Sequence, residues 1–160
     1  MPHAALDEPA LRDALGAAGL RYTRQRGAVY EGLASAQGHP TAEEVYQRVK
    51  PTVPAISLAT VYKALEALTA SGLAAKLAAS DGTARYDARP DCHYHLRCLR
   101  SGAVEDLPTD FDPDLVARLD PGLADRLGQR GFRVTGYRLE LVGYFDREGP
   151  APPSPEGDPT

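Results

Sequence analysis

The sequence predicts an α+β protein built from two units. Four segments with helical spacing of apolar residues fill the first part of the chain, and a hairpin signal, Asp81-Gly82, follows them. Beyond Pro90, short strand-like and helix-like segments alternate. At 160 residues, of which 42% are hydrophobic, the chain is long enough for two small domains that share an interface.

Each of the four expected helices begins at a residue type that caps helices through its side chain. These residues are Asp7, Thr23, Thr41 and Ser57. Glu44, three residues after Thr41, completes a capping box. Gly19, Pro51 and Gly72 are expected to end three of the helices. The side chains expected on the buried faces are Leu11, Leu15, Ala18, Val29, Tyr30, Leu33, Val45, Val49, Val61, Leu65 and Leu68.

Helices that end in a β-hairpin, with a short turn between the third and the fourth, are typical of a winged helix-turn-helix domain. We expect this DNA-binding architecture in residues 1–89, with the helix after Ser57 in the recognition position. Three- and four-helix bundles have the same periodicity, so the pattern alone leaves them open.

The second unit is expected in residues 90–147. Strands are expected at "CHYHLRCL" and "AVEDL", and each of two short helices follows an Asp-Pro pair at its cap. A long final strand is expected at "FRVTGYRLELVGYF". A unit of this size is marginal alone, so pairing of the long strand with a second copy would supply burial, as in a dimerisation domain. Residues 148–160 form a Pro-rich polar tail, expected to be disordered.

Charge and cysteine content restrict the function classes. The net charge is −4, yet residues 1–89 carry 10 Lys/Arg against 9 Asp/Glu, and Arg21, Arg24 and Arg26 form a local basic cluster suited to phosphate. The same arginines have an alternative reading as an ordinary solvated surface. Two cysteines in one segment make no disulfide framework, and neither a signal peptide nor a membrane-spanning run is evident, so a cytoplasmic protein is expected.

The segment "CHYHLRC" concentrates metal-ligand residue types. On a regular strand His93 and His95 face one side, whereas Cys92 and Cys98 have the opposite parity. The four side chains therefore cannot all meet one ion, and the two histidines point to a site without thiolates.

Further donors are expected near the junction of the two units. His39 precedes the third helix, Asp87 ends the hairpin, and Glu105 and Asp106 lie in the strand after the Ser101 turn. Parity does not choose between Glu105 and Asp106. Imidazole and carboxylate donors together suit Mn²⁺, Fe²⁺ or Zn²⁺.

Seven motifs together resemble the ferric uptake regulator (Fur) family of bacterial metal-dependent repressors, over roughly residues 8–147. They are "GLRYTRQR", "HPTAEEVY", "ISLATVYKALEAL", "GLAAKL", "ARYD", "HYHLRC" and "YRLELVGYF". The resemblance implies a winged-helix domain followed by an α/β dimerisation domain. It implies one regulatory divalent metal, Fe²⁺ or Mn²⁺ before Zn²⁺, held by His39, Asp87, His93, His95 and Asp106. Two aspartates in this set resemble the peroxide-responsive branch, since the iron-responsive branch more often carries glutamates there.

The sequence departs from the family pattern at two further metal sites. A structural zinc held by two Cys-x-x-Cys pairs is not expected, because the first pair reads Cys98-Leu-Arg-Ser101 and the final strand has no cysteine. A second, histidine-rich site is not expected either, because Cys92, Tyr94 and Tyr137 stand at its places. Cys92 and Cys98 are interpreted as small hydrophobic residues rather than redox groups.

The resemblance also places residues at a DNA interface. They are Arg21, Ser57, Thr60, Tyr62 and Lys63. Arg21 matches a position that reaches the minor groove, while Tyr62 can contact a thymine methyl and Lys63 a base or phosphate. Packing of Tyr62 in the core is the alternative, although its place between the buried positions Val61 and Leu65 favours exposure.

The predicted function is a homodimeric transcriptional repressor, not an enzyme, which binds a palindromic operator when its metal is bound and controls metal homeostasis or the peroxide response. A zinc-responsive uptake repressor of the same family is the first alternative. A metal-dependent hydrolase is a second, for which the sequence supplies neither nucleophile nor phosphate loop. A dimer in which the metal is purely structural is a third.

Overall fold

Four capped helices build the first unit of the computed structural model, which describes residues 5–78, 82–89 and 91–152. The helices are α1 (Glu8–Ala17), α2 (Arg24–Ala34), α3 (Ala42–Val49) and α4 (Leu58–Ala70). All four expected caps are confirmed, since the side chains of Asp7, Thr23, Thr41 and Ser57 each accept a backbone N–H of the first turn. Both hydrogen bonds of the Thr41–Glu44 capping box are present.

The core of this unit lies between the helices α1 to α4 and the β-hairpin that follows them. All but one of the side chains expected on the buried faces are buried, and Ile56 and Tyr86 join them. Ala18 is the exception, because α1 ends at Ala17 and Ala18 is its exposed C-cap.

A two-stranded antiparallel wing follows α4. Its strands are β1 (Ala75–Ala78) and β2 (Ala84–Asp87), and Ala75 pairs with Asp87. Asp81 of the expected turn lies outside the described residues, and Gly82 has a φ of +79°. The N–H of Tyr86 donates to the carbonyl of Pro40 at 2.9 Å, which holds β2 against the loop before α3. The end of the wing is therefore held next to His39.

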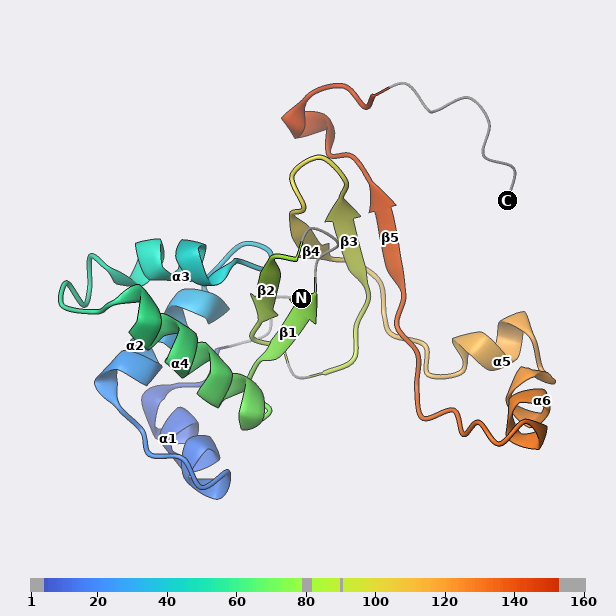
Figure 1. Cartoon of the computed structure of the whole chain (residues 1–160), viewed down its shortest axis with the longest axis horizontal. Coiled ribbons are helices and arrows are strands. Elements are labelled where there is room, and N and C mark those ends of the chain that lie inside the picture. Colours follow the sequence, from blue (N-terminus) through green and yellow to red (C-terminus); the bar gives the residue numbers. More distant parts are fainter. Residues whose placement is uncertain (1–4, 79–81, 90, 153–160) are drawn as a thin grey trace.

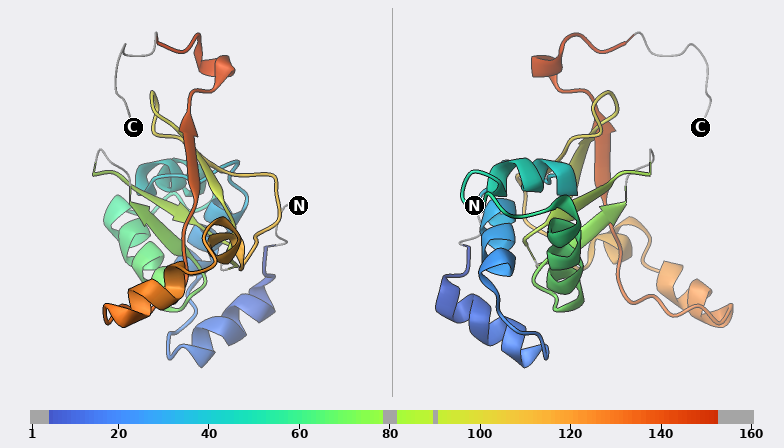
Figure 2. Two further views of the ribbon diagram at one scale, coloured as in Figure 1. Left: turned by 90° about the vertical axis from the view of Figure 1, so that its right-hand side faces the viewer. Right: turned by 60° about the vertical axis from the view of Figure 1, so that its left-hand side comes forward.

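The second unit contains a three-stranded sheet in the order β4-β3-β5. Its strands are β3 (His95–Cys98), β4 (Val104–Asp106) and β5 (Glu140–Gly143). The β3–β4 pair is antiparallel with His95 opposite Asp106, and β5 pairs with β3 in parallel. In Figure 1 the wing lies between the helices α1 to α4 and this sheet, and in the left view of Figure 2, seen from the side of the sheet, β5 lies in front of the wing.

Two short helices, α5 (Leu115–Leu119) and α6 (Leu123–Gln129), lie beyond β5 and away from α1 to α4 (Figure 1). The expectation that Asp112 and Asp120 cap them was wrong, since each helix begins later and has no side-chain cap. Asp112 instead accepts a hydrogen bond from the N–H of Asp114, and Asp120 accepts one from the N–H of Gly122. Both carboxylates therefore form local turns before the helices.

The expected long final strand is also much shorter than predicted. Within the described residues, β5 pairs with one strand, β3. The pairing covers the four residues Glu140–Gly143 and leaves the rest of the expected strand without a ladder. A short 3₁₀ turn, η1 (Asp146–Glu148), follows, and Arg100 donates to the carbonyls of Glu148, Gly149 and Pro150. Residues 153–160 of the expected tail lie outside the described residues, and the proposed domain boundaries stay predictions. In the described part of the chain no helix has the length and apolar character needed to cross a membrane.

Candidate metal centre

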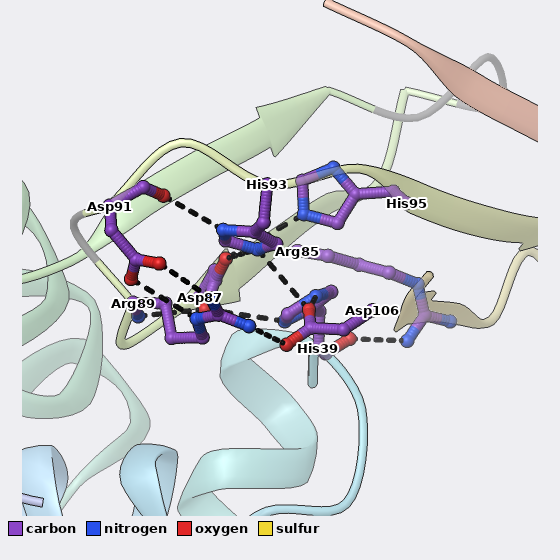
Figure 3. Close-up of polar contacts among 8 residues, drawn as sticks. All are labelled: His39, Arg85, Asp87, Arg89, Asp91, His93, His95 and Asp106. Carbon is purple, nitrogen blue, oxygen red and sulfur yellow. Dashed lines mark hydrogen bonds and ion pairs between the residues drawn. The ribbon is translucent and has the colours of Figure 1, made fainter. Parts of the chain in front are cut away.

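Five side chains from both units converge where the wing meets the sheet (Figure 3). One donor atom of each lies within 4.8 Å of those of all the others. They are the five residues that the sequence resemblance selected: His39, Asp87, His93, His95 and Asp106.

Local structure explains why residues so far apart in sequence meet here. His39 lies in the loop before α3, and its carbonyl accepts from Arg85 Nη1 on β2 at 2.9 Å. Asp87 is the last residue of β2, next to that loop. Antiparallel pairing puts His95 directly opposite Asp106, so their side chains share one face of the sheet. His93 precedes β3 and lies beside His95, with 4.6 Å between the ring centroids.

The donor atoms approach one another closely. His39 Nε2 lies 2.7 Å from Asp106 Oδ1, and His93 Nε2 lies 3.2 Å from the same oxygen. His93 Nε2 is also 2.9 Å from Asp87 Oδ2, while His95 Nε2 is 3.6 Å from it. Asp106 thus turns Oδ1 to His39 and His93, while Asp87 turns Oδ2 to His93 and His95 and has Oδ1 at 3.6 Å from His39 Nδ1.

Three of these atoms are buried without a hydrogen bond of acceptable geometry: Asp87 Oδ2, His93 Nε2 and His95 Nε2. The distance of 2.9 Å between His93 Nε2 and Asp87 Oδ2 is short enough for a hydrogen bond, but the angles at the two atoms do not allow one. Buried polar atoms left unpaired carry a free-energy cost, and three that lie so close together are suited to hold a shared cation. Three imidazole nitrogens and two carboxylate oxygens fit Mn²⁺, Fe²⁺ or Zn²⁺.

Burial and charge prepare two of the donors for a cation. Burial lowers the pKa of His39 below its usual 6.5, so its imidazole is neutral near pH 7. Burial alone would raise the pKa of Asp87, but the neighbouring imidazoles of His95 and His39 and the backbone N–H of Arg89 together lower it below 3.8. A neutral imidazole and an ionised carboxylate are the forms that bind metal.

The alternative left open by strand parity is decided by where each side chain lies. Asp106 reaches the cluster, whereas the carboxylate of Glu105 forms an ion pair with Arg147. Both residues also line a cleft of about 410 Å³, together with His39 and Asp87. The cleft gives solvent a route to the donors.

Arg89 is a residue at this site that sequence reasoning did not single out. Its guanidinium donates to Asp106 and Asp91, and its backbone N–H donates to Asp87. The one signal in the sequence is its position two residues after Asp87, which is too common an arrangement to be informative.

The two cysteines lie apart from the cluster. Cys92 is exposed, and Cys98 is buried. The thiol of Cys98 donates to Glu148 Oε2 at 2.9 Å, and Ser101 Oγ donates to Glu148 Oε1 at 2.9 Å. Tyr94 and Tyr137 stand where the family pattern has the second, histidine-rich metal site, and their hydroxyl oxygens are 2.6 Å apart.

The residues expected at a DNA interface lie on two parts of the helical unit. Ser57, Tyr62 and Lys63 are exposed on α4 or at its cap, and Thr60 is half-buried. Tyr62 does not pack in the core; its hydroxyl donates to Glu43 Oε1 at 2.7 Å. Arg21 is exposed on the segment between α1 and α2. Their contact with DNA stays a prediction.

Comparisons with known proteins agree with this arrangement. The family model described as "Ferric uptake regulator family" matches residues 17–142. A peroxide-responsive repressor, PerR, of Staphylococcus aureus strain Mu50 is 36% identical over 128 residues, which are 79% of this chain and 80% of that protein.

Two solved structures extend the likeness to the fold. A zinc-bound manganese uptake regulator is 31% identical with a TM-score of 0.63, over 84% of this chain and 97% of that one. The Vibrio cholerae ferric uptake regulator is 26% identical with a TM-score of 0.65, over 84% and 99%. The chain belongs to the ferric uptake regulator family.

Proposed function

We propose that this protein is a metal-dependent transcriptional repressor that binds a palindromic operator as a homodimer when Fe²⁺ or Mn²⁺ occupies the five-residue cluster. The observation that carries the proposal is the convergence of donors from the loop before α3, the wing and the sheet on one point. A metal held there would fix the angle between the units and hence the spacing of two α4 helices in a dimer.

A metal supplies charge and coordination in this function, while the chain supplies orientation. His39 and Asp87 belong to the helical unit, and His93, His95 and Asp106 to the sheet side. Binding to both sides favours the one relative orientation in which all five donors meet. Because a ligand shifts an equilibrium only through its differential affinity for the two states, the two-sided donor set is the feature that makes metal a switch.

Dimer formation is supported by the free edge of the sheet. β5 is an outer strand of the order β4-β3-β5. Its Leu141 and Val142 have exposed fractions of 49% and 60%, and Phe132 and Val134 on the same segment are exposed too. Apolar side chains on an edge strand favour pairing with another chain. Replacing Val142 with Lys is expected to convert a dimer into a monomer in light scattering.

For DNA contact we propose Arg21, Ser57, Thr60, Tyr62 and Lys63. The support is their position on or beside α4, which is the second helix of the α3–α4 pair and lies next to the wing (Figure 1).

The switch is tested with DNA selected from a random duplex library by the Mn²⁺-loaded protein. We expect tight binding with Mn²⁺ and at least about 10-fold weaker binding with chelator, within the usual range of coupling between sites. The paired variant His93→Ala/His95→Ala is expected to bind weakly in both conditions. Equal binding with and without metal would contradict the proposal and leave a purely structural metal. Retained binding by the paired variant would place the switch elsewhere.

The signal is a finer proposal, supported by the likeness to a peroxide-responsive repressor. Peroxide treatment of the Fe²⁺ form is expected to release DNA and to add the mass of one oxygen atom to a peptide that contains His39, His93 or His95. DNA binding that survives peroxide, with no such addition, would instead support simple metal sensing, including sensing of Zn²⁺.

A further inference from the structure

Arg89 contacts both aspartates of the cluster, and each contact is to the carboxylate oxygen that lies farther from the His93 ring (Figure 3). Its backbone N–H donates to Asp87 Oδ1 at 2.8 Å, and its Nη1 donates to Asp106 Oδ2 at 2.9 Å. The other oxygens, Asp87 Oδ2 and Asp106 Oδ1, are those within 3.2 Å of the His93 ring. One residue thus occupies half of each carboxylate.

Asp91 holds Arg89 in this position. The guanidinium donates from Nε to Asp91 Oδ1 at 3.1 Å and from Nη2 to Asp91 Oδ2, which is a fork of two parallel bonds. The backbone carbonyl of Asp91 lies 2.8 Å from His93 Nδ1 and accepts a hydrogen bond from it, so that Nε2 faces the cluster. Through this pair, Asp87, Asp106 and His93 all have fixed orientations.

The pair adds little net charge to the site. Arg89 and Asp91 form an ion pair through Nη2 and Oδ2, so the positive charge of the guanidinium is balanced by a carboxylate in contact with it. Arg89 is therefore not a counter-ion that competes with a metal by charge alone. The fork to Asp91 uses two of the five N–H groups of the Arg89 guanidinium, and Nη1 directs a third to Asp106.

We infer that Arg89 is a positioning residue that makes each aspartate offer one oxygen, not two, to the metal. This inference rests on the proposed function. Carboxylates bind divalent cations through one oxygen or both. With Asp106 Oδ2 held by Arg89, the five residues supply five donors, and without Arg89 the same carboxylate is free to rotate and chelate with both oxygens. Arg89 in this way limits the coordination number.

The test removes the pair without changing the charge near the site. The variant is Arg89→Met/Asp91→Asn, which keeps the backbone N–H of residue 89 and the carbonyl of residue 91. The matched control is Arg126→Met/Asp120→Asn, which removes an Arg–Asp pair of the same kind beside α6. Co²⁺ serves as the probe, because its visible absorbance reports geometry and weakens as donors increase from five to six.

We expect the Arg89→Met/Asp91→Asn protein to bind Co²⁺ about 10- to 100-fold more weakly, the usual effect of losing a residue that orients a metal ligand. At saturating Co²⁺ its visible absorbance is expected to be several-fold lower than that of the parent, while the control pair matches the parent. If the double variant does not fold, Arg89→Lys replaces it. A single ammonium cannot span Asp91 and Asp106 as the fork does, and the same loss of absorbance is expected.

A spectrum of the variant that superimposes on that of the parent at saturation overturns the inference, whatever the affinity, because general loosening alone can weaken binding. Failure of the proposed function gives a different result. In that case the parent protein itself shows no change in DNA binding with metal, irrespective of Arg89.

Discussion

The backbone N–H of His39 donates a hydrogen bond to the carbonyl oxygen of Val104, with 2.8 Å between the two atoms. Gly38, the residue before, has a φ of +81°, and a Cβ built on it would lie 2.9 Å from that same oxygen. The loop that carries His39 thus rests on β4 through main-chain contact, two residues from Asp106. A shift of β4 relative to the helices would move His39 directly.

Gly38→Ala is expected to weaken metal binding about 10-fold, because the new methyl group pushes the His39 loop off β4. It should also reduce the free energy of unfolding by about 1–3 kcal/mol through the positive φ. The control is Gly72→Ala, at a φ of +74° with open space around it. That variant should lose stability but keep the parent's metal affinity in a fluorescence titration. A Gly38→Ala protein with unchanged affinity would show that the contact with Val104 does not position His39.

Lys63→Gln is expected to weaken binding to the selected operator and to reduce the slope of affinity against salt by about 1, as for loss of one phosphate contact. The side chain is exposed on α4 and available for such a contact. Arg130→Gln, at the C-cap of α6 in the other unit, is the charge-matched control. Fluorescence anisotropy over a range of salt concentrations measures both quantities. A salt slope identical to that of the parent would remove Lys63 from the interface.

The metal-free protein is expected to lose stability as pH falls below about 6.5, because the buried His39 of the folded state takes up a proton less readily than in the unfolded chain. The lowered pKa of Asp87 acts in the same direction at more acidic pH, where protonation of the carboxylate removes its contribution. His39→Gln should flatten the change between pH 7.5 and 5.5 in urea denaturation with chelator. An equal pH dependence in the variant would show that His39 is not the group responsible.

Glu148→Gln is expected to destabilise the protein, since the two donors on Cys98 and Ser101 would face an amide with one acceptor oxygen. Thermal melting should then occur at a lower temperature than in the parent. Glu8→Gln, which disrupts an exposed pair with Arg12 on α1, is the control and should change little. Melting of Glu148→Gln at the parent's temperature would mean that the C-terminal turn adds no stability.

Local sequence signals predicted the helical unit well. Capping side chains act within one turn, so Asp7, Thr23 and Thr41 could be read without knowledge of the fold. The long final strand was mispredicted because alternation indicates exposure on two faces and says nothing about whether a partner strand exists. Within the part of the chain that the structure describes, only Glu140–Gly143 of this segment has a partner strand, which is β3.

The five candidate metal ligands were predicted from the sequence, but the residue that orients two of them was not. Strand parity related His93 to His95, and position near the junction of the two units pointed to His39, Asp87 and either Glu105 or Asp106. The resemblance to a family then joined the five residues into one site. Arg89 was missed, since its role depends on which oxygens of Asp87 and Asp106 it contacts, a property of three-dimensional register. Strand parity could not choose between Glu105 and Asp106; the resemblance selected Asp106, and the strand pairing, which puts Asp106 opposite His95, gives the physical reason.

Tyr94, Phe111 and Tyr137 form a packed aromatic group where some relatives have a second metal site, with Phe111 stacked on Tyr137 at 5.3 Å. Among the residues that the structure describes, the His39–Asp106 cluster is the one group of three or more His, Cys, Asp or Glu side chains close enough to share an ion. On the proposed function, a metal titration of this protein would then show a single step, and metal content per chain would count the fraction of molecules ready to bind DNA. Elemental analysis of the protein taken from cells would read the state of the regulator directly.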